Sequence, residues 1–214
     1  MTDFAAARTR MVERQLRRRG IEDERVLAAM GEVPREAFLP EGLRDRAYED
    51  SALPIAAEQT ISQPWIVAAI CQALELEGSE LVLEVGTGSG YSAAVLARLA
   101  AHVVSIERHE ELSQTAAETL AALGVRNVEI VVGDGSLGVP ARASFDAIAV
   151  HATAPAPPPA LIGQLADVGR LVVPVSGEDA DMLTLLRREG ERTETMSLGP
   201  CRFVPLIGEE GFAG

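Results

Sequence analysis

The sequence predicts an α/β protein with a doubly wound, mostly parallel seven-stranded sheet and a helical extension at the N-terminus. The stretch 81–99, LVLEVGTGSGYSAAVLARL, passes from an apolar strand pattern through a glycine-rich turn into a helical pattern. After it, strand patterns alternate with helical patterns, which is typical of a parallel sheet covered by helices on both faces. We therefore interpret residues 78–214 as one compact α/β unit and residues 1–77 as a helical extension with a substrate-side segment.

The extension begins with helical patterns. We expect residues 1–8 to be frayed and a helix to run over about 10–19, because Gly20 favours a helix end. Asp23 can cap a second helix. Further along, Phe38 is expected to anchor a turn segment in the core.

The segment QTISQPW, residues 59–65, carries two hydroxyls at alternate positions. Thr60 and Ser62 point the same way if the chain is extended there. Pro64 is suited to the first turn of a helix, so Ser62 could be a helix cap or a functional hydroxyl. The sequence leaves both interpretations of Ser62 open.

The glycines of the turn stand at alternate positions. A dinucleotide fingerprint, G-x-G-x-x-G, would need glycine where Tyr91 stands, and this disfavours a nicotinamide oxidoreductase. G-x-G-x-G is instead the loop of class I, Rossmann-like S-adenosylmethionine-dependent methyltransferases. Free N–H groups at the helix start can face a polar ligand. The candidate cofactor contacts here are Glu84, Gly86, Thr87, Gly88, Ser89 and Gly90.

Two acids follow the next two strand patterns. Glu107 ends the strand 102–107, about 20 residues after the first glycine, where an acid commonly holds a ribose diol. Asp134 follows the strand 127–132 and can receive an adenine amino group. Together these acids and the glycine loop predict a bound adenosyl cofactor, with Arg108 and Gly135 as further candidate contacts.

The remaining strand patterns complete the sheet. They lie at 145–150, 171–175, 182–186 and 196–206, with a helix from about Ala160 that Gly169 should end. The last strands should form an antiparallel edge.

Composition excludes several classes of protein. A net charge of −13 argues against a general nucleic-acid binder. No apolar run reaches the roughly 18 residues that a membrane span needs, and the N-terminus lacks a signal-peptide core. Cys71 and Cys201 are expected to be reduced thiols, and the three histidines lack zinc-type spacing. We therefore expect a cytoplasmic monomer without metal, membrane or nucleic acid.

Several passages together resemble one family over nearly the whole chain. They are MVERQLRRRGIEDERVLAAMGEVPREAF, YEDSALPI, QTISQPWIVA, VLEVGTGSGYSAAVLA, SIE, GDG, FDAI, PALIGQL, GRLVVPV and RFVPL. The chain is similar to protein-L-isoaspartate O-methyltransferases of the bacterial type. QTISQP and RFVPL are specific to that family, whereas VLEVGTGSGY indicates only the broad methyltransferase class.

The resemblance implies a fold, a cofactor and a reaction. The family transfers a methyl group from S-adenosyl-L-methionine to the free carboxylate of L-isoaspartyl residues in damaged proteins, leaving S-adenosyl-L-homocysteine. The ester then closes to a succinimide, and hydrolysis partly restores aspartate. By this resemblance Ser62 and Thr60 belong to the active site, and Ile61 is a neighbour that contacts the cofactor.

The chain departs from the family pattern in three places. Ala56-Ala57-Glu58 replaces a glycine-rich segment, His151 stands where threonine is common, and Trp65 replaces a frequent tyrosine. These departures leave two alternatives open: a methyltransferase that acts on aspartate of a dedicated peptide to form a succinimide, or a non-catalytic adenosyl-cofactor-binding module. The candidate substrate-side residues are Ala57, Trp65, His151 and Val204.

Overall fold

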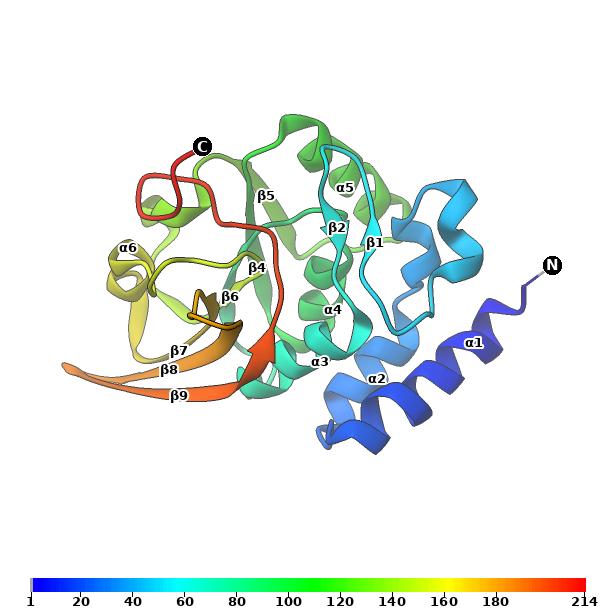
Figure 1. Cartoon of the computed structure of the whole chain (residues 1–214), viewed down its shortest axis with the longest axis horizontal. Coiled ribbons are helices and arrows are strands. Elements are labelled where there is room, and N and C mark those ends of the chain that lie inside the picture. Colours follow the sequence, from blue (N-terminus) through cyan, green and yellow to red (C-terminus); the bar gives the residue numbers. More distant parts are fainter. Residues whose placement is uncertain (1) are drawn as a thin grey trace.

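The computed structural model describes residues 2–214 and has a seven-stranded sheet as its centre, in the order β5-β4-β3-β6-β7-β8-β9 (Figure 1). Neighbouring strands from β5 to β7 run parallel, whereas β7, β8 and β9 pair antiparallel. The predicted doubly wound sheet with an antiparallel edge is therefore confirmed. The strands are β3 Leu81–Val85, β4 His102–Glu107, β5 Val128–Val132, β6 Phe145–Val150, β7 Leu165–Val175, β8 Asp181–Glu189 and β9 Arg192–Cys201.

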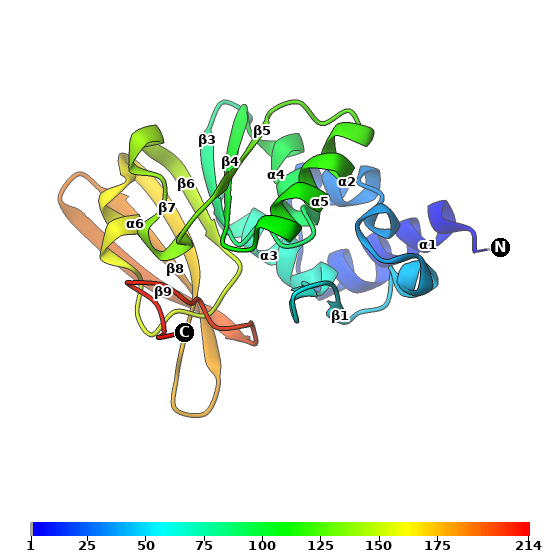
Figure 2. The ribbon, with the colours of Figure 1, turned by 90° about the horizontal axis from the view of Figure 1, so that it is seen from above.

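Alternate side chains of the inner strands enter two separate apolar cores. On β3, Val82 joins the core shared with the N-terminal helices, whereas Leu83 joins the core on the opposite face. This alternation follows from the period of two in a strand. Helices cover both faces, as Figure 2 shows from above. They are α3 Pro64–Ala73, α4 Tyr91–Leu99, α5 Glu110–Ala122 and α6 Pro159–Gly163.

The helix expected to end at Gly169 is shorter than predicted, and that boundary was wrong. α6 ends at Gly163, and β7 begins at Leu165. The reason is tertiary: the antiparallel β8 extends past the parallel sheet and pairs with Val168 and Gly169. Pairing with β8 thus places Val168 and Gly169 in a strand, although their local sequence pattern favoured a helix.

The N-terminal extension is helical from Phe4, so the expected fraying was wrong for residues 4–8; Met1 lies outside the described residues. Helix α1, Phe4–Met11, is capped by Asp3, whose carboxylate accepts from the N–H of Ala6. A π-helical turn, Val12–Leu16, and a 3-10 turn, Arg17–Arg19, continue the helical path. Gly20, which has φ 90°, ends this path as predicted.

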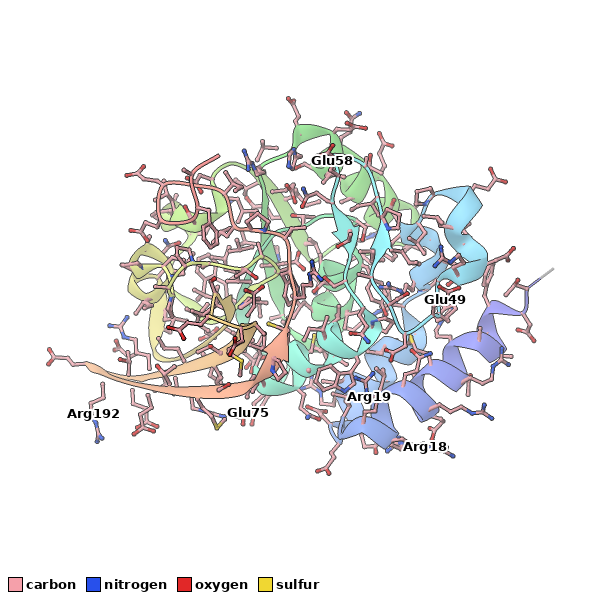
Figure 3. The ribbon with its side chains drawn as sticks, in the orientation of Figure 1. Arg18, Arg19, Glu49, Glu58, Glu75 and Arg192 are labelled. Atoms are coloured by element: carbon pink, nitrogen blue, oxygen red, sulfur yellow. The ribbon has the colours of Figure 1, made fainter. Side chains whose placement is uncertain are left out.

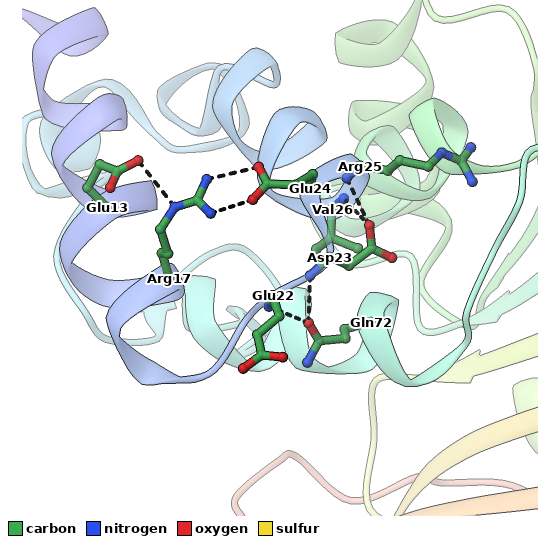
Figure 4. Close-up of polar contacts among 8 residues, drawn as sticks. All are labelled: Glu13, Arg17, Glu22, Asp23, Glu24, Arg25, Val26 and Gln72. Atoms are coloured by element: carbon green, nitrogen blue, oxygen red, sulfur yellow. Dashed lines mark hydrogen bonds and ion pairs between the residues drawn. The ribbon is translucent and has the colours of Figure 1, made fainter.

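Polar contacts join the second helix to its neighbours (Figure 4). Asp23 caps α2, Glu24–Glu32, by accepting from two backbone N–H groups, as predicted. Arg17 pairs with both oxygens of Glu24. Gln72 of α3 accepts from the N–H groups of Glu22 and Asp23. The extension is thereby fixed to the helix that follows QTISQP.

A buried arginine connects the extension to the glycine-rich turn. Arg35 is fully buried, donates to the carbonyl of Ala47 at 2.7 Å, and lies 5.0 Å from the ring centre of Tyr91. Phe38 meets the same ring edge-on, so its predicted anchoring role is confirmed. Tyr91 begins α4 directly after the last glycine of the loop.

A small hairpin lies outside the central sheet. Strands β1, Leu53–Pro54, and β2, Thr60–Ile61, pair antiparallel. Ala57 and Glu58 in its turn have φ of 53° and 57°, a left-handed conformation that L residues adopt at a cost. Figure 3 labels Glu58 at the tip of this hairpin.

The C-terminal residues return from β9 across the carboxyl edge of the sheet. Pro205 forms a bridge with Thr153, and Ile207 forms one with Phe212. β9 lies at the edge of the sheet, so one side of its backbone pairs with no strand of residues 2–214. Within residues 2–214, no helix combines the length and the apolar character required to cross a bilayer.

Candidate active site

A cavity of about 330 Å³ lies at the carboxyl edge of the parallel strands. One wall is the glycine loop with the end of β4, and the opposite wall is the segment from Glu58 to Ser62. The C-terminal residues 204–207 close a third side. The edge beyond the carboxyl ends of parallel strands is where open α/β sheets bind ligands.

At two positions of the glycine loop, an added side chain would disturb the backbone conformation or the packing. Gly90 has φ 85°, and a Cβ on it would lie 3.0 Å from the Cβ of Ala116 on α5. Gly86 has φ 92° and lies against His151. The loop can therefore pass between α5 and the end of β6 only with glycine at these positions.

Glu107 connects the loop to β4. One carboxylate oxygen accepts from the N–H of Gly88 at 2.9 Å, and the other accepts from the N–H of His109 at 3.0 Å. The side chain is 5% exposed and lines the cavity. The structure thus presents a fixed acceptor where the sequence predicts a ribose contact.

Asp134 is held differently. One of its oxygens accepts from the N–H and hydroxyl of Ser136, and the other accepts from the N–H of Glu209 at 2.8 Å. Burial opposes ionisation, but these donors outweigh it and lower the pKa of Asp134. Its neighbour Gly135 lines the cavity, whereas Asp134 itself lies outside the lining and binds the C-terminal segment.

Glu84 lies beneath the glycine loop and is fully buried. Its Oε2 accepts from the hydroxyl of Ser105 at 2.5 Å, and that hydroxyl lies 2.5 Å from Oγ1 of Thr87. Burial raises the pKa of Glu84 to about 8. On the other side, Oε1 lies 3.5 Å from Nε2 of His151.

The wall formed by the segment from Glu58 to Ser62 carries hydroxyls that make no hydrogen bond within residues 2–214. Thr60, Ile61 and Ser62 all line the cavity. Gln63 is the N-cap residue of α3 and makes no side-chain cap bond, and the hydroxyls of Thr60 and Ser62 make no hydrogen bond within residues 2–214. The helix-cap interpretation of Ser62 therefore has no support in the geometry.

The four substrate-side candidates divide into two pairs. His151 and Val204 line the cavity. Ala57 lies in the hairpin turn outside the lining. Trp65 packs on Arg19, whose guanidinium lies 4.9 Å from the ring centre, and its indole N–H donates to the carbonyl of Arg19.

Arg108 also lines the cavity, beside Glu107. Across residues 2–214, no group of three or more His, Cys, Asp or Glu side chains is arranged to hold a metal ion.

Residues 7–211 match the family described as protein-L-isoaspartate (D-aspartate) O-methyltransferase. The chain belongs to this family. It is 54% identical over 214 residues to protein-L-isoaspartate O-methyltransferase 1 of Rhodopseudomonas palustris strain HaA2, across 99% of this chain and 87% of that relative. It is 52% identical to the protein of the same name from Syntrophobacter fumaroxidans, over the full length of both chains.

Solved structures of the family share the fold. One protein-L-isoaspartate O-methyltransferase matches with a TM-score of 0.84 at 30% identity, over 95% of this chain and 67% of that chain. Another, from Plasmodium falciparum in complex with S-adenosyl-L-homocysteine, matches with a TM-score of 0.79 at 25% identity, over 97% and 99% of the two chains.

Sequence reasoning missed several residues of this methyltransferase fold that border the site. Ser92 contacts His151 from α4, and Ser105 lies opposite Glu84 in the strand register. The pairing of β3 with β4 could have indicated Ser105, because residues at matching positions of adjacent strands face the same side. Nothing in the local pattern indicated that Ile207 would return to the cavity.

Proposed function

We propose that this protein transfers the methyl group of S-adenosyl-L-methionine to the free carboxylate of L-isoaspartyl residues in damaged proteins and peptides. One observation carries the proposal: a single cavity joins the glycine loop and Glu107 to the Thr60–Ser62 segment. A donor cofactor and an acceptor carboxylate need such adjacent walls. Membership of the family over residues 7–211 supports the same reaction.

The residues at the cavity fit the cofactor. Its volume of about 330 Å³ lies within the range of small-molecule sites, about 300–1,000 Å³. Glu107 offers its carboxylate to a ribose diol, and the glycine loop lets polar groups approach the backbone. Behind the lining residues, Glu84 has a buried oxygen without a hydrogen-bond partner, which suits a cationic group.

When bound, S-adenosyl-L-methionine supplies an electrophilic methyl group on a positively charged sulfur. The acceptor carboxylate has a reference pKa near 4, so it is ionised at neutral pH and needs no general base. The chain's task is orientation, which contributes a large part of the rate in reactions of this kind. Thr60 and Ser62, with free hydroxyls on the acceptor wall, are the residues we assign to it.

Neutral donors suit this reaction better than a cation. Attack of a carboxylate on a sulfonium methyl removes both charges, so a cation held on the carboxylate would stabilise the ground state more than the transition state. Neutral hydroxyl groups orient the carboxylate while stabilising its ground state less, relative to the transition state, than a cation would. The charged residue Arg108 lies beside Glu107, on the cofactor wall.

The proposal extends to the organisation of the chain and its setting. We assign cofactor binding to residues 78–214, which contain the whole central sheet, and the substrate-side wall to residues 1–77, which carry Thr60 and Ser62. The proposal also includes a cytoplasmic monomer that acts on isoaspartyl proteins without a membrane. The net charge of −13 supports the absence of a nucleic-acid partner, and the unpaired cysteines Cys71 and Cys201 support a reducing compartment.

The test uses two peptides that differ only in carrying L-isoaspartate or normal L-aspartate. With labelled S-adenosyl-L-methionine, we expect methyl transfer to the isoaspartyl peptide and little to its partner. Both carboxylates are equally ionised, so discrimination must come from position, and a misplacement of about 1 Å costs on the order of a hundredfold in rate. Equal labelling of both peptides would contradict repair specificity. Labelling of neither, with cofactor still bound, would favour a dedicated aspartyl peptide or a non-catalytic module.

A further inference from the structure

Four side chains from four elements meet beneath the glycine loop. Glu84 is the penultimate residue of β3, Ser105 lies beside it on β4, Ser92 is on α4, and His151 follows β6. Nε2 of His151 lies 2.7 Å from the hydroxyl of Ser92 and 3.5 Å from Oε1 of Glu84. Oε1 has no hydrogen-bond partner, although it is buried. The imidazole and the hydroxyl of Ser92 are the polar groups beside it that can supply one.

No arginine pairs with Glu84 within residues 2–214, and the chain contains no lysine. The other titratable groups near it are Glu107 on β4, whose charge opposes a second negative charge, and the thiol of Cys71 on α3. On the His151 side, α4 presents the neutral Ser92, and the ring of Phe203 lies 6.4 Å from the imidazole. Within residues 2–214 the cluster therefore contains no cation to balance a charge on Glu84, and two of its members, Ser92 and His151, line the cavity.

We propose that His151 is a positioning residue for Glu84: its neutral imidazole is the hydrogen-bond partner that lets Glu84 ionise when a cationic cofactor enters the cavity. This inference rests on the proposed function, because it takes S-adenosyl-L-methionine as the ligand.

The consequence is a proton released on binding. Without ligand, burial raises the pKa of Glu84 to about 8, so at pH 7 it is roughly nine-tenths protonated. Burial lowers the pKa of His151 to about 4, so the imidazole is neutral at that pH and can donate through Nε2. A positive charge beside Glu84 favours its carboxylate, and the proton leaves to solvent. Affinity for the cofactor should then rise with pH up to about pH 8 and level off above it.

Calorimetry tests this without turnover. S-adenosyl-L-methionine is titrated into the protein at pH 7, without peptide, in two buffers that differ in ionisation enthalpy. We expect release of between about half and one proton, and an affinity that rises by up to about tenfold per pH unit below pH 8. Glu84→Gln should bind without this release and with an affinity nearly independent of pH.

Variants of His151 separate positioning from packing. His151→Phe keeps a ring and removes both nitrogens, so affinity at pH 7 should fall about tenfold, as expected for one hydrogen bond to a charged group. The affinity of this variant for S-adenosyl-L-methionine should also begin to rise only at a higher pH than that of the wild-type protein. His151→Gln, which can place an N–H near the Nε2 position, should restore much of the wild-type profile. His102→Gln, at the opposite end of β4, is the matched control and should leave the profile unchanged.

The outcomes are distinguishable. Binding of S-adenosyl-L-methionine with no proton release in the wild-type protein overturns this inference and leaves the proposed function standing. An unchanged affinity and pH profile in folded His151→Phe also overturns it. If the wild-type protein does not bind S-adenosyl-L-methionine at all, the proposed function fails, and the inference fails with it.

Discussion

The two walls of the cavity are built differently. On the cofactor wall, Glu107 is nearly buried and both of its oxygens already accept from backbone N–H groups. On the acceptor wall, Thr60 is exposed, and its hydroxyl, like that of Ser62, has no partner within residues 2–214. The turn that precedes Thr60 also holds two non-glycine residues in a left-handed conformation.

The cofactor wall is therefore preformed, whereas the hydrogen bonds of the acceptor wall are completed only when its ligand binds. Acceptors fixed by the backbone bind with little loss of conformational freedom, so they give affinity for a ligand of constant shape. Free hydroxyls at the end of a small hairpin can form their hydrogen bonds to many peptides that share one carboxylate. The cofactor wall should therefore govern cofactor affinity, and the acceptor wall should govern turnover.

The largest effect should follow Glu107→Ala. Loss of a charged hydrogen-bond acceptor costs roughly 1.5–3 kcal/mol, which corresponds to about a 10- to 100-fold weaker binding of S-adenosyl-L-homocysteine. Calorimetric titration measures the dissociation constant. Glu118→Ala, an exposed acid on α5, is the control. An unchanged dissociation constant in Glu107→Ala would remove the ribose contact from this wall.

Ser62→Ala should lower kcat for an isoaspartyl peptide by about tenfold, since one hydrogen bond to the carboxylate is lost. Cofactor affinity and melting temperature should stay near wild-type, because this hydroxyl makes no bond in the protein. Ser197→Ala, on an exposed part of β9, is the control for removal of a hydroxyl. A lower melting temperature with unchanged kcat would identify Ser62 as a structural residue.

Asp134→Asn should act mainly on stability. Asn has one acceptor oxygen where Asp134 uses two, so a loss of about 1 kcal/mol is expected from chemical denaturation at pH 7. The pKa of Asp134 is lowered in the folded protein, so its stabilisation is present above its ordinary value near 3.8 and is lost as the pH falls below it. The difference between variant and wild type should shrink in that range. A tenfold loss of cofactor affinity at unchanged stability would instead support the adenine contact.

Trp65→Phe should have the smallest effect. Its indole contacts Arg19 outside the cavity, so the KM for an isoaspartyl peptide should stay within about twofold of wild type, and stability should fall by about 0.5–1 kcal/mol. Steady-state kinetics with peptides of different flanks would check this. A KM that changes for some flanks only would return Trp65 to the substrate side.

Much of the fold was predictable because its signals are local. The strand 145–150 and the caps at Gly20 and Asp23 follow from periodicity and capping chemistry. The start of β7 was not predictable in this way, because Leu165 pairs with Phe145 of β6 and Val168 and Gly169 pair with β8, which comes later in the chain. The helical pattern near Gly169 gave no indication of that partner.

The candidate site shows the same limit. Gly86, Glu107 and Ser62 were predicted from motifs, and the structure brings them to one cavity. Asp134 was predicted as an adenine contact from its position between two glycines after a strand, and that contact stays a prediction. Its carboxylate also accepts from the N–H of Glu209, a contact between segments distant in sequence that no local pattern indicated. The cluster of Glu84 and His151 likewise depends on which faces of two strands meet α4.

The free edge of β9 has a consequence for how this molecule meets other chains. An unpaired strand edge can bind extended segments and start aggregation. The β8–β9 register shifts between Leu183 and Thr184 of β8, and Pro200 near the end of β9 has no N–H to donate. Arg192 and Glu194 place charges at the start of β9. Only a short regular stretch is left for an added strand. Extended segments of the proposed isoaspartyl substrates should therefore find little of this edge to pair with.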